Sequence, residues 1–143
     1  MFVKRLCELA ARKEALKYPE FRQRVEEQIT TTQPAAETQR AAEQAITATL
    51  ETLSERLTGG EATDLTAQLP QEIQAPLERS AEEAESFSVE EFCQRVADRE
   101  GVDIDTARND ASAVMTVLRV AVTSAQLEDL MSQLPSEFNV LFR

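Results

Sequence analysis

The sequence repeats itself, and this internal repeat is the feature that most limits how the chain can fold. Residues 20–25 read Glu-Phe-Arg-Gln-Arg-Val and match residues 91–96, Glu-Phe-Cys-Gln-Arg-Val, at every position but one. Residues 64–73 align in the same way with residues 129–138, and both segments contain Asp-Leu and Gln-Leu-Pro. The offset between the copies falls from 71 to 65 residues, which places extra residues of the first copy in a loop around Thr30 to Pro34. A repeat of this length predicts two units with the same local structure.

Each unit is predicted to contain four helices. Strong helix formers (Ala, Leu, Glu, Gln and Arg) dominate the chain, whereas the β-branched runs typical of strands are scarce. Capping boxes at Ser88 and Thr123 mark two helix starts. In order, we expect helices at about 19–29, 36–57, from Gly59 and from Pro70 in the first unit, and at about 89–100, 106–122, from Thr123 and from Pro135 in the second.

These boundaries divide the chain into four parts and make the protein all-α. Residues 1–17 precede the repeats, residues 19–79 form the first repeat, residues 80–87 form an acidic, exposed linker, and residues 88–143 form the second repeat. With 42% hydrophobic residues in 143, the two tandem four-helix repeats can bury a core. The helix that contains residues 113–122 is apolar nearly all round, so we expect it to be central, with Leu118 among the most buried residues.

Residues 1–17 differ from the rest of the chain and predict a basic amphipathic helix. They carry five cations and two carboxylates, a net charge of +3, whereas the remaining residues sum to −14. Such a helix docks on the protein's own acidic surface, binds a partner protein, or lies weakly on an anionic membrane, and the sequence leaves these three alternatives open. If it binds a partner, its apolar stripe and cations supply the contact: Phe2, Lys4, Arg5, Leu6, Leu9, Arg12 and Lys13.

Several motifs connect the chain to a known family. The segment Arg-Leu-Thr-Gly-Gly-Glu-Ala at residues 56–62 is followed by Asp-Leu at 64–65 and by Ala-Gln-Leu-Pro at 67–70. Together with the paired Glu-Phe-X-Gln-Arg-Val starts, this pattern resembles the domain of unknown function 2267 family of bacteria and archaea. The resemblance covers residues 19–143, and it implies an all-helical tandem fold with pseudo-two-fold symmetry. It implies no activity and no functional residues, and residues 1–17 lie outside the family pattern.

The residue types present argue against a catalytic, cofactor or metal site. Histidine is absent, which removes the commonest general base, the usual Ser and Cys triads and most zinc sites. Cys7 and Cys93 lack metal-ligand spacing, and we expect both to be free thiols. Gly59-Gly60 is not a phosphate loop, because no Gly-Lys-Ser/Thr follows it. Linker and helix-cap roles account for the acidic residues between Glu82 and Glu91.

Charge and hydropathy limit the partners and the compartment. A formal net charge of −11 disfavours nucleic acid, whose phosphates attract Lys and Arg. No apolar stretch approaches the roughly 20 residues of a membrane-spanning helix. The sequence also lacks a recognisable signal peptide, so we expect a cytoplasmic protein. The charge does not predict an oligomeric state.

The sequence favours a non-enzymatic interaction or scaffold protein, with a protein partner held by the tandem body and by the first helix. A second hypothesis is a sensor module that binds a small apolar ligand between the two helical halves. A more distant hypothesis is an enzyme that uses carboxylates alone.

Overall fold

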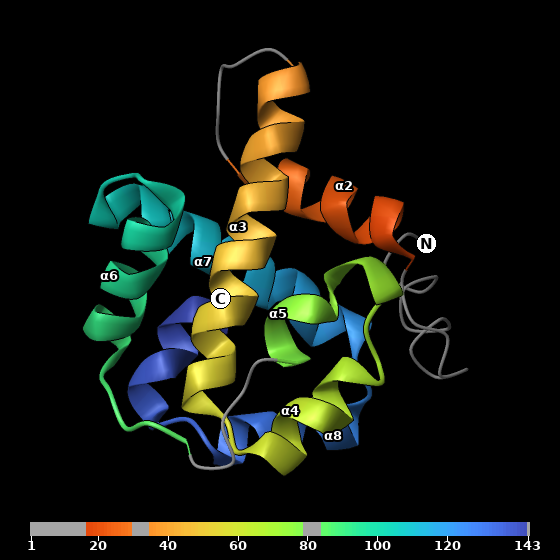
Figure 1. The fold of residues 1–143 in the computed structure, drawn as a ribbon, viewed down its shortest axis with the longest axis vertical. Helices are drawn as coiled ribbons and strands as arrows, with labels where there is room; N and C mark the ends of the chain where they lie inside the picture. Colours follow the sequence, from red (N-terminus) through yellow and green to blue (C-terminus); the bar gives the residue numbers. More distant parts are fainter. Residues whose placement is uncertain (1–16, 30–34, 79–83, 143) are drawn as a thin grey trace.

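The computed structural model describes residues 17–29, 35–78 and 84–142, and Figure 1 shows their arrangement. Over these ranges the chain is helical and contains no strand, so the all-α prediction is confirmed for the described part of the chain. The helices, in order, are α2 (Tyr18–Gln28), α3 (Ala35–Arg56), α4 (Gly59–Thr66), the 3₁₀ turn η1 (Gln71–Ile73), α5 (Ala75–Glu78), α6 (Val89–Glu100), α7 (Ile104–Ala121), α8 (Ser124–Ser132) and the 3₁₀ segment η2 (Ser136–Phe142).

The last element of each unit differs from its prediction. Pro70 and Pro135 were expected to be the first residues of a helix, but η1 and η2 begin one residue later. Pro70 has φ −56° and ψ 145°, an extended conformation, so it lies outside the turn that follows it. The helix predicted to begin at residue 106 starts at Ile104, because the Asp103 carboxylate accepts a hydrogen bond of 2.7 Å from the Thr106 amide.

The two capping boxes form only in part. The Ser88 hydroxyl accepts a hydrogen bond from the Glu91 amide at 3.1 Å, and the Thr123 hydroxyl accepts one from the Gln126 amide at 3.2 Å. The reciprocal side chains are engaged elsewhere: the Glu91 carboxylate accepts from Arg95, and Gln126 contacts Glu61. The hydroxyls therefore set where α6 and α8 begin, and the longer side chains serve tertiary contacts instead.

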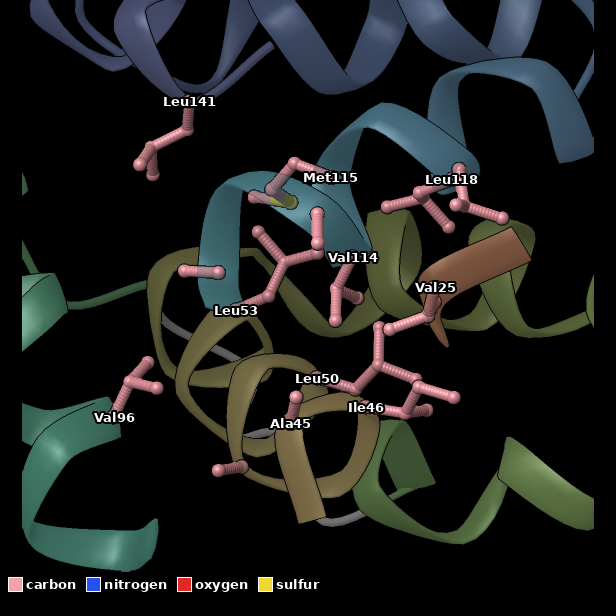
Figure 2. Packing of buried hydrophobic residues seen from close by; sticks show 14 of the residues in the cluster. Val25, Ala45, Ile46, Leu50, Leu53, Val96, Val114, Met115, Leu118 and Leu141 are labelled. Carbon is pink, nitrogen blue, oxygen red and sulfur yellow. The ribbon is translucent and has the colours of Figure 1, made fainter. Parts of the chain in front are cut away.

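Helix α7 lies at the centre of the core. It packs against α2, α3, α6 and η2. Figure 2 shows side chains from several of these elements converging, including Val25 of α2, Leu50 and Leu53 of α3, and Val114 of α7. Leu118 is 0% exposed, which confirms its predicted position among the most buried residues.

The repeated phenylalanines are both core residues. Phe21 of α2 and Phe92 of α6 are fully buried, as are Val25 and Val96 one turn further along each helix. The Phe92 ring meets the Phe138 ring edge to face, with centroids 5.6 Å apart. Among the described residues, no helix is long and apolar enough to cross a membrane.

Candidate interaction surface

The partner-binding residues predicted from the sequence lie outside the described residues, so the structure places none of them: Phe2, Lys4, Arg5, Leu6, Leu9, Arg12 and Lys13. The candidate surface therefore has to be sought on the helical body. The family-like segment at residues 56–62 is the natural starting point, because it joins α3 to α4.

Arg56, the last residue of α3, binds the segment that precedes α6 through hydrogen bonds and ring contacts. It is only 7% exposed, and its guanidinium donates hydrogen bonds of 3.1 Å to the carbonyl oxygens of Glu85 and Phe87. The same guanidinium lies 5.6 Å from the centroid of the Phe87 ring and 5.4 Å from that of Phe138. Arg95 lies 4.0 Å from the Phe87 centroid. We call Arg56, Phe87, Arg95 and Phe138 the arginine clasp. These contacts hold residues 85–87 against the helical body.

The glutamines of the two Gln-Leu-Pro motifs make reciprocal contacts between α4 and α8. The Thr123 amide at the start of α8 donates to Gln68 Oε1 at 2.8 Å, and the Thr58 amide at the start of α4 donates to Gln133 Oε1 at 3.1 Å. Gln68 follows α4 and accepts from the residue that caps α8, and Gln133 follows α8 and accepts from the residue that caps α4. Backbone amides at helix starts need such acceptors, so both contacts stabilise the packing of α4 against α8.

A buried polar network fills the space between α4 and α8. Gln126 Nε2 donates to Glu61 Oε1 at 2.5 Å, and Gln68 Nε2 donates to Gln126 Oε1 at 3.3 Å. Burial is the main cause that raises the pKa of Glu61, and the nearby carboxylates Asp129 and Asp64 raise it further. Polar side chains, rather than an apolar cavity, therefore lie between α4 and α8.

A groove of about 760 Å³ opens to solvent between α4 and α5. Small residues of α4 form one wall, and Gln74 forms part of the other, held in place because its Nε2 donates to the carbonyl oxygens of Thr66 (3.1 Å) and Leu69 (3.0 Å). A Cβ atom added at Gly60 meets no atom within 4 Å, so the space above this residue is open. The groove is lined by Gly59, Gly60, Thr63, Thr66, Ala67, Gln74, Leu77 and Glu78.

The exposed face of α4 differs from the corresponding face of α8. Gly60, Thr63 and Ala67 are exposed and follow the spacing i, i+3, i+7, so they form one row along the helix. In α8 the aligned positions are Ala125, Glu128 and Ser132, which are also exposed. The row on α4 thus carries only small side chains, whereas the row on α8 carries a glutamate at its centre.

Ion pairs hold the wall of a second groove of about 260 Å³, between α3 and α6. Arg99 lines this groove, and its Nη1 lies 2.9 Å from Glu55 Oε1 and donates to the Thr52 hydroxyl at 2.6 Å. The hydrogen bond from Arg99 is the largest cause that lowers the pKa of Glu55. Glu51 lies 3.7 Å from the Arg99 Nε. These contacts join α3 to α6 and leave the Arg99 guanidinium already paired.

Three further groups, Glu100, Asp110 and Cys93, line neither groove. Glu100 and Asp110 meet between α6 and α7, a pair that the sequence analysis missed. Cys93 is a free, buried thiol whose pKa is raised, mainly by burial, so its nucleophilic thiolate is disfavoured. Within the described ranges, no group of three or more His, Cys, Asp or Glu residues is placed to hold a metal ion.

These features define an all-helical protein with a polar junction between α4 and α8 and an open, small-residue groove on α4. The sequence model of a family described as an uncharacterized conserved protein, DUF2267, matches residues 18–141, and the chain belongs to that family. The resemblance inferred from the Arg56–Ala62 segment and the paired motifs is thus confirmed. No curated protein matches the chain.

Proposed function

We propose that the protein is a non-enzymatic, cytoplasmic interaction or scaffold protein. Its helical body recognises a partner protein through the groove between α4 and α5, and residues 1–17 act as an additional anchor for that partner. The open row of Gly60, Thr63 and Ala67 on α4 is the observation that carries this proposal.

The proposed body consists of two tandem helical units related by a pseudo-two-fold axis between α4 and α8. The reciprocal contacts of Gln68 with Thr123 and of Gln133 with Thr58 support this arrangement, because aligned residues exchange roles across the junction. The contact of Glu61 with Gln126, also aligned residues, supports it as well. In this arrangement the exposed row of the third helix carries no long side chain in the first unit but carries Glu128 in the second, so the body offers one docking face and not two.

The proposed partner segment is an amphipathic helix with cationic side chains. Small residues at the spacing i, i+3, i+7 allow another helix to approach closely, since no long side chain separates the two backbones. Glu78 lines the groove, and the chain carries a net charge of −11, so cations beside the apolar stripe of the partner are favoured. Burying each large apolar side chain of such a helix contributes roughly 1.5–3 kcal/mol.

The substitution Ala67→Arg tests this docking face. A long cationic side chain at the end of α4 in the groove wall prevents close approach of a helix, and we expect it to weaken the partner interaction about 10-fold or more. The measurement is the dissociation constant for the protein that co-purifies stoichiometrically with the intact chain. Ser132→Arg is the matched control, because Ser132 is the exposed, aligned residue of α8 and the change in charge is the same.

Both variants alter exposed positions, so both should melt within a degree or two of the parent. Equal weakening by Ala67→Arg and Ser132→Arg would point to a general charge effect and reject the groove. Unchanged binding of both variants would also reject it.

The two other functions have less support. Binding of an apolar ligand between the halves is disfavoured because Glu61, Gln68 and Gln126 form a polar network there. Carboxylate-based catalysis requires an acid and a base that a substrate can reach, yet neither Glu100 nor Asp110 lines either of the two grooves described above.

A further inference from the structure

Two carboxyl groups from neighbouring helices meet inside the protein. Glu100 is the last residue of α6, Asp110 lies in the first half of α7, and their carboxyl groups interact where these two helices pack together. Asp110 is only 6% exposed, and Glu100 Oε1 is buried without a hydrogen-bond partner. Two neighbouring carboxylates that are both ionised and buried repel each other strongly, because little solvent is present to screen them.

Charged groups on the same two helices do not compensate the pair. Arg99 of α6 is directed toward Glu55 of α3, at 2.9 Å. Arg108 of α7 lies 3.7 Å from Asp105, and Asp98 of α6 accepts a hydrogen bond from Gln94. None of these groups contributes to the electrostatic balance at Glu100 or Asp110.

In the part of the chain that the structure describes, the other elements that pack against α6 and α7 do not contribute a compensating charge to either carboxyl. Arg22 of α2 pairs with Glu26, and Glu51 and Glu55 of α3 pair with Arg99. Glu137 of η2 accepts from the Val89 amide at the opposite end of α6. Within residues 17–29, 35–78 and 84–142, the electrostatic effects on each carboxyl come from burial and from the other carboxyl.

We propose that Glu100 and Asp110 share a single proton at neutral pH, and that this proton stabilises the packing of the C-terminal end of α6 against α7. Glu100 carries the proton and donates it to the Asp110 carboxylate. Loss of the proton leaves two adjacent anions between the helices, so the α6–α7 contact loosens at alkaline pH. Figure 1 shows the chain turning at the end of α6 directly into α7.

The direction of the pH effect follows from the pKa of Glu100, which differs between the folded and the unfolded protein. Burial, and next the hydrogen bond and charge of Asp110, raise the pKa of Glu100 to about 9, from an ordinary value of 4.5. The folded state therefore binds this proton more tightly than the unfolded state does. The stability that the proton contributes is fully present below the unfolded pKa of Glu100 and is lost as pH rises through the folded value. Acidification from alkaline pH thus stabilises the fold.

The test is the melting temperature measured from about pH 5 to pH 10 for the parent and for Glu100→Gln. A glutamine keeps the donor toward Asp110 without needing a proton. The parent is expected to lose several degrees across this range, whereas Glu100→Gln is expected to lose most of that dependence and to melt above the parent at neutral and alkaline pH. Glu128→Gln, an exposed carboxylate on α8, is the control and should keep the parent's dependence.

An infrared spectrum provides a second readout that does not depend on stability. At neutral pH the parent should show the carbonyl band of a buried, protonated carboxyl group, and the band should be absent from Glu100→Gln. A parent without the band, or a Glu100→Gln variant with the parent's pH dependence, overturns the proposal. If Glu100→Gln does not fold, Asp110→Asn takes its place, with the same expected loss of pH dependence. The α4 groove is not involved, so failure here leaves the proposed function unaffected.

Discussion

Replacing Leu118 with alanine lowers the free energy of unfolding by roughly 2–5 kcal/mol. Leu118 is fully buried in α7, the helix that packs against α2, α3, α6 and η2, so the truncated side chain leaves a cavity that several elements would have to close. The loss is a large share of the roughly 5–15 kcal/mol by which a domain of this kind is stable. Urea denaturation of the variant and the parent measures it.

Val140→Ala is the matched control for Leu118→Ala. Val140 in η2 is 44% exposed, so the same kind of truncation leaves no enclosed cavity and should change the free energy of unfolding by less than about 0.5 kcal/mol. If Leu118→Ala and Val140→Ala unfold at the same urea concentration, α7 is not the centre of the core.

Arg56→Ala is expected to lower the free energy of unfolding by roughly 2–4 kcal/mol. The substitution removes two hydrogen bonds from a charged donor to the Glu85 and Phe87 carbonyls, each of a kind that contributes roughly 1.5–3 kcal/mol. It also removes the cation between the Phe87 and Phe138 rings, a contact of roughly 0.5–2 kcal/mol. The contributions do not simply add, because the remaining groups relax into the vacated space.

Two further variants make the Arg56 experiment specific. Arg56→Lys should recover only part of the loss, because an ammonium group lacks the planar fork that reaches both carbonyls and stacks on the rings. Arg119→Ala is the control: Arg119 donates to one carbonyl, that of Phe142 at 3.0 Å, from an exposed position and should matter much less. Equal losses for Arg56→Ala and Arg119→Ala would contradict the role of the arginine clasp.

Elements specified by local signals could be predicted from the sequence. The Ser88 and Thr123 hydroxyls each bond to a backbone amide within their own turn, so residues 88–91 and 123–126 alone indicate where α6 and α8 begin. Leu118 could be predicted in the same way, because an apolar run that covers every face of a helix must be enclosed by other elements. The starts of α6 and α8 and the buried position of α7 were therefore predicted correctly.

Long-range partners could not be predicted, because no local pattern encodes them. Arg56 bonds to carbonyls about 30 residues further along the chain, and Gln133 bonds to Thr58 across 75 residues. The Glu100–Asp110 pair was missed for a related reason: Asp110 interrupts the apolar face of α7, and only its position opposite Glu100 explains a buried carboxyl there. Asp110 on that face was the one signal in the sequence that could have pointed to the pair.

The role of residues 1–17 is tested most directly with a chain that begins at Tyr18, compared with the full protein by melting in the presence and absence of a peptide of residues 1–17. If these residues anchor a partner, the shortened chain melts within a degree or two of the full protein, the peptide does not raise its melting temperature, and the stoichiometric partner is lost. Because residues 1–17 carry a net charge of +3, added salt is expected to weaken that partner interaction, mainly by slowing association. A shortened chain that melts several degrees lower, is restored by the peptide and keeps its partner would contradict the anchor, because residues 1–17 would then cover the protein's own acidic body.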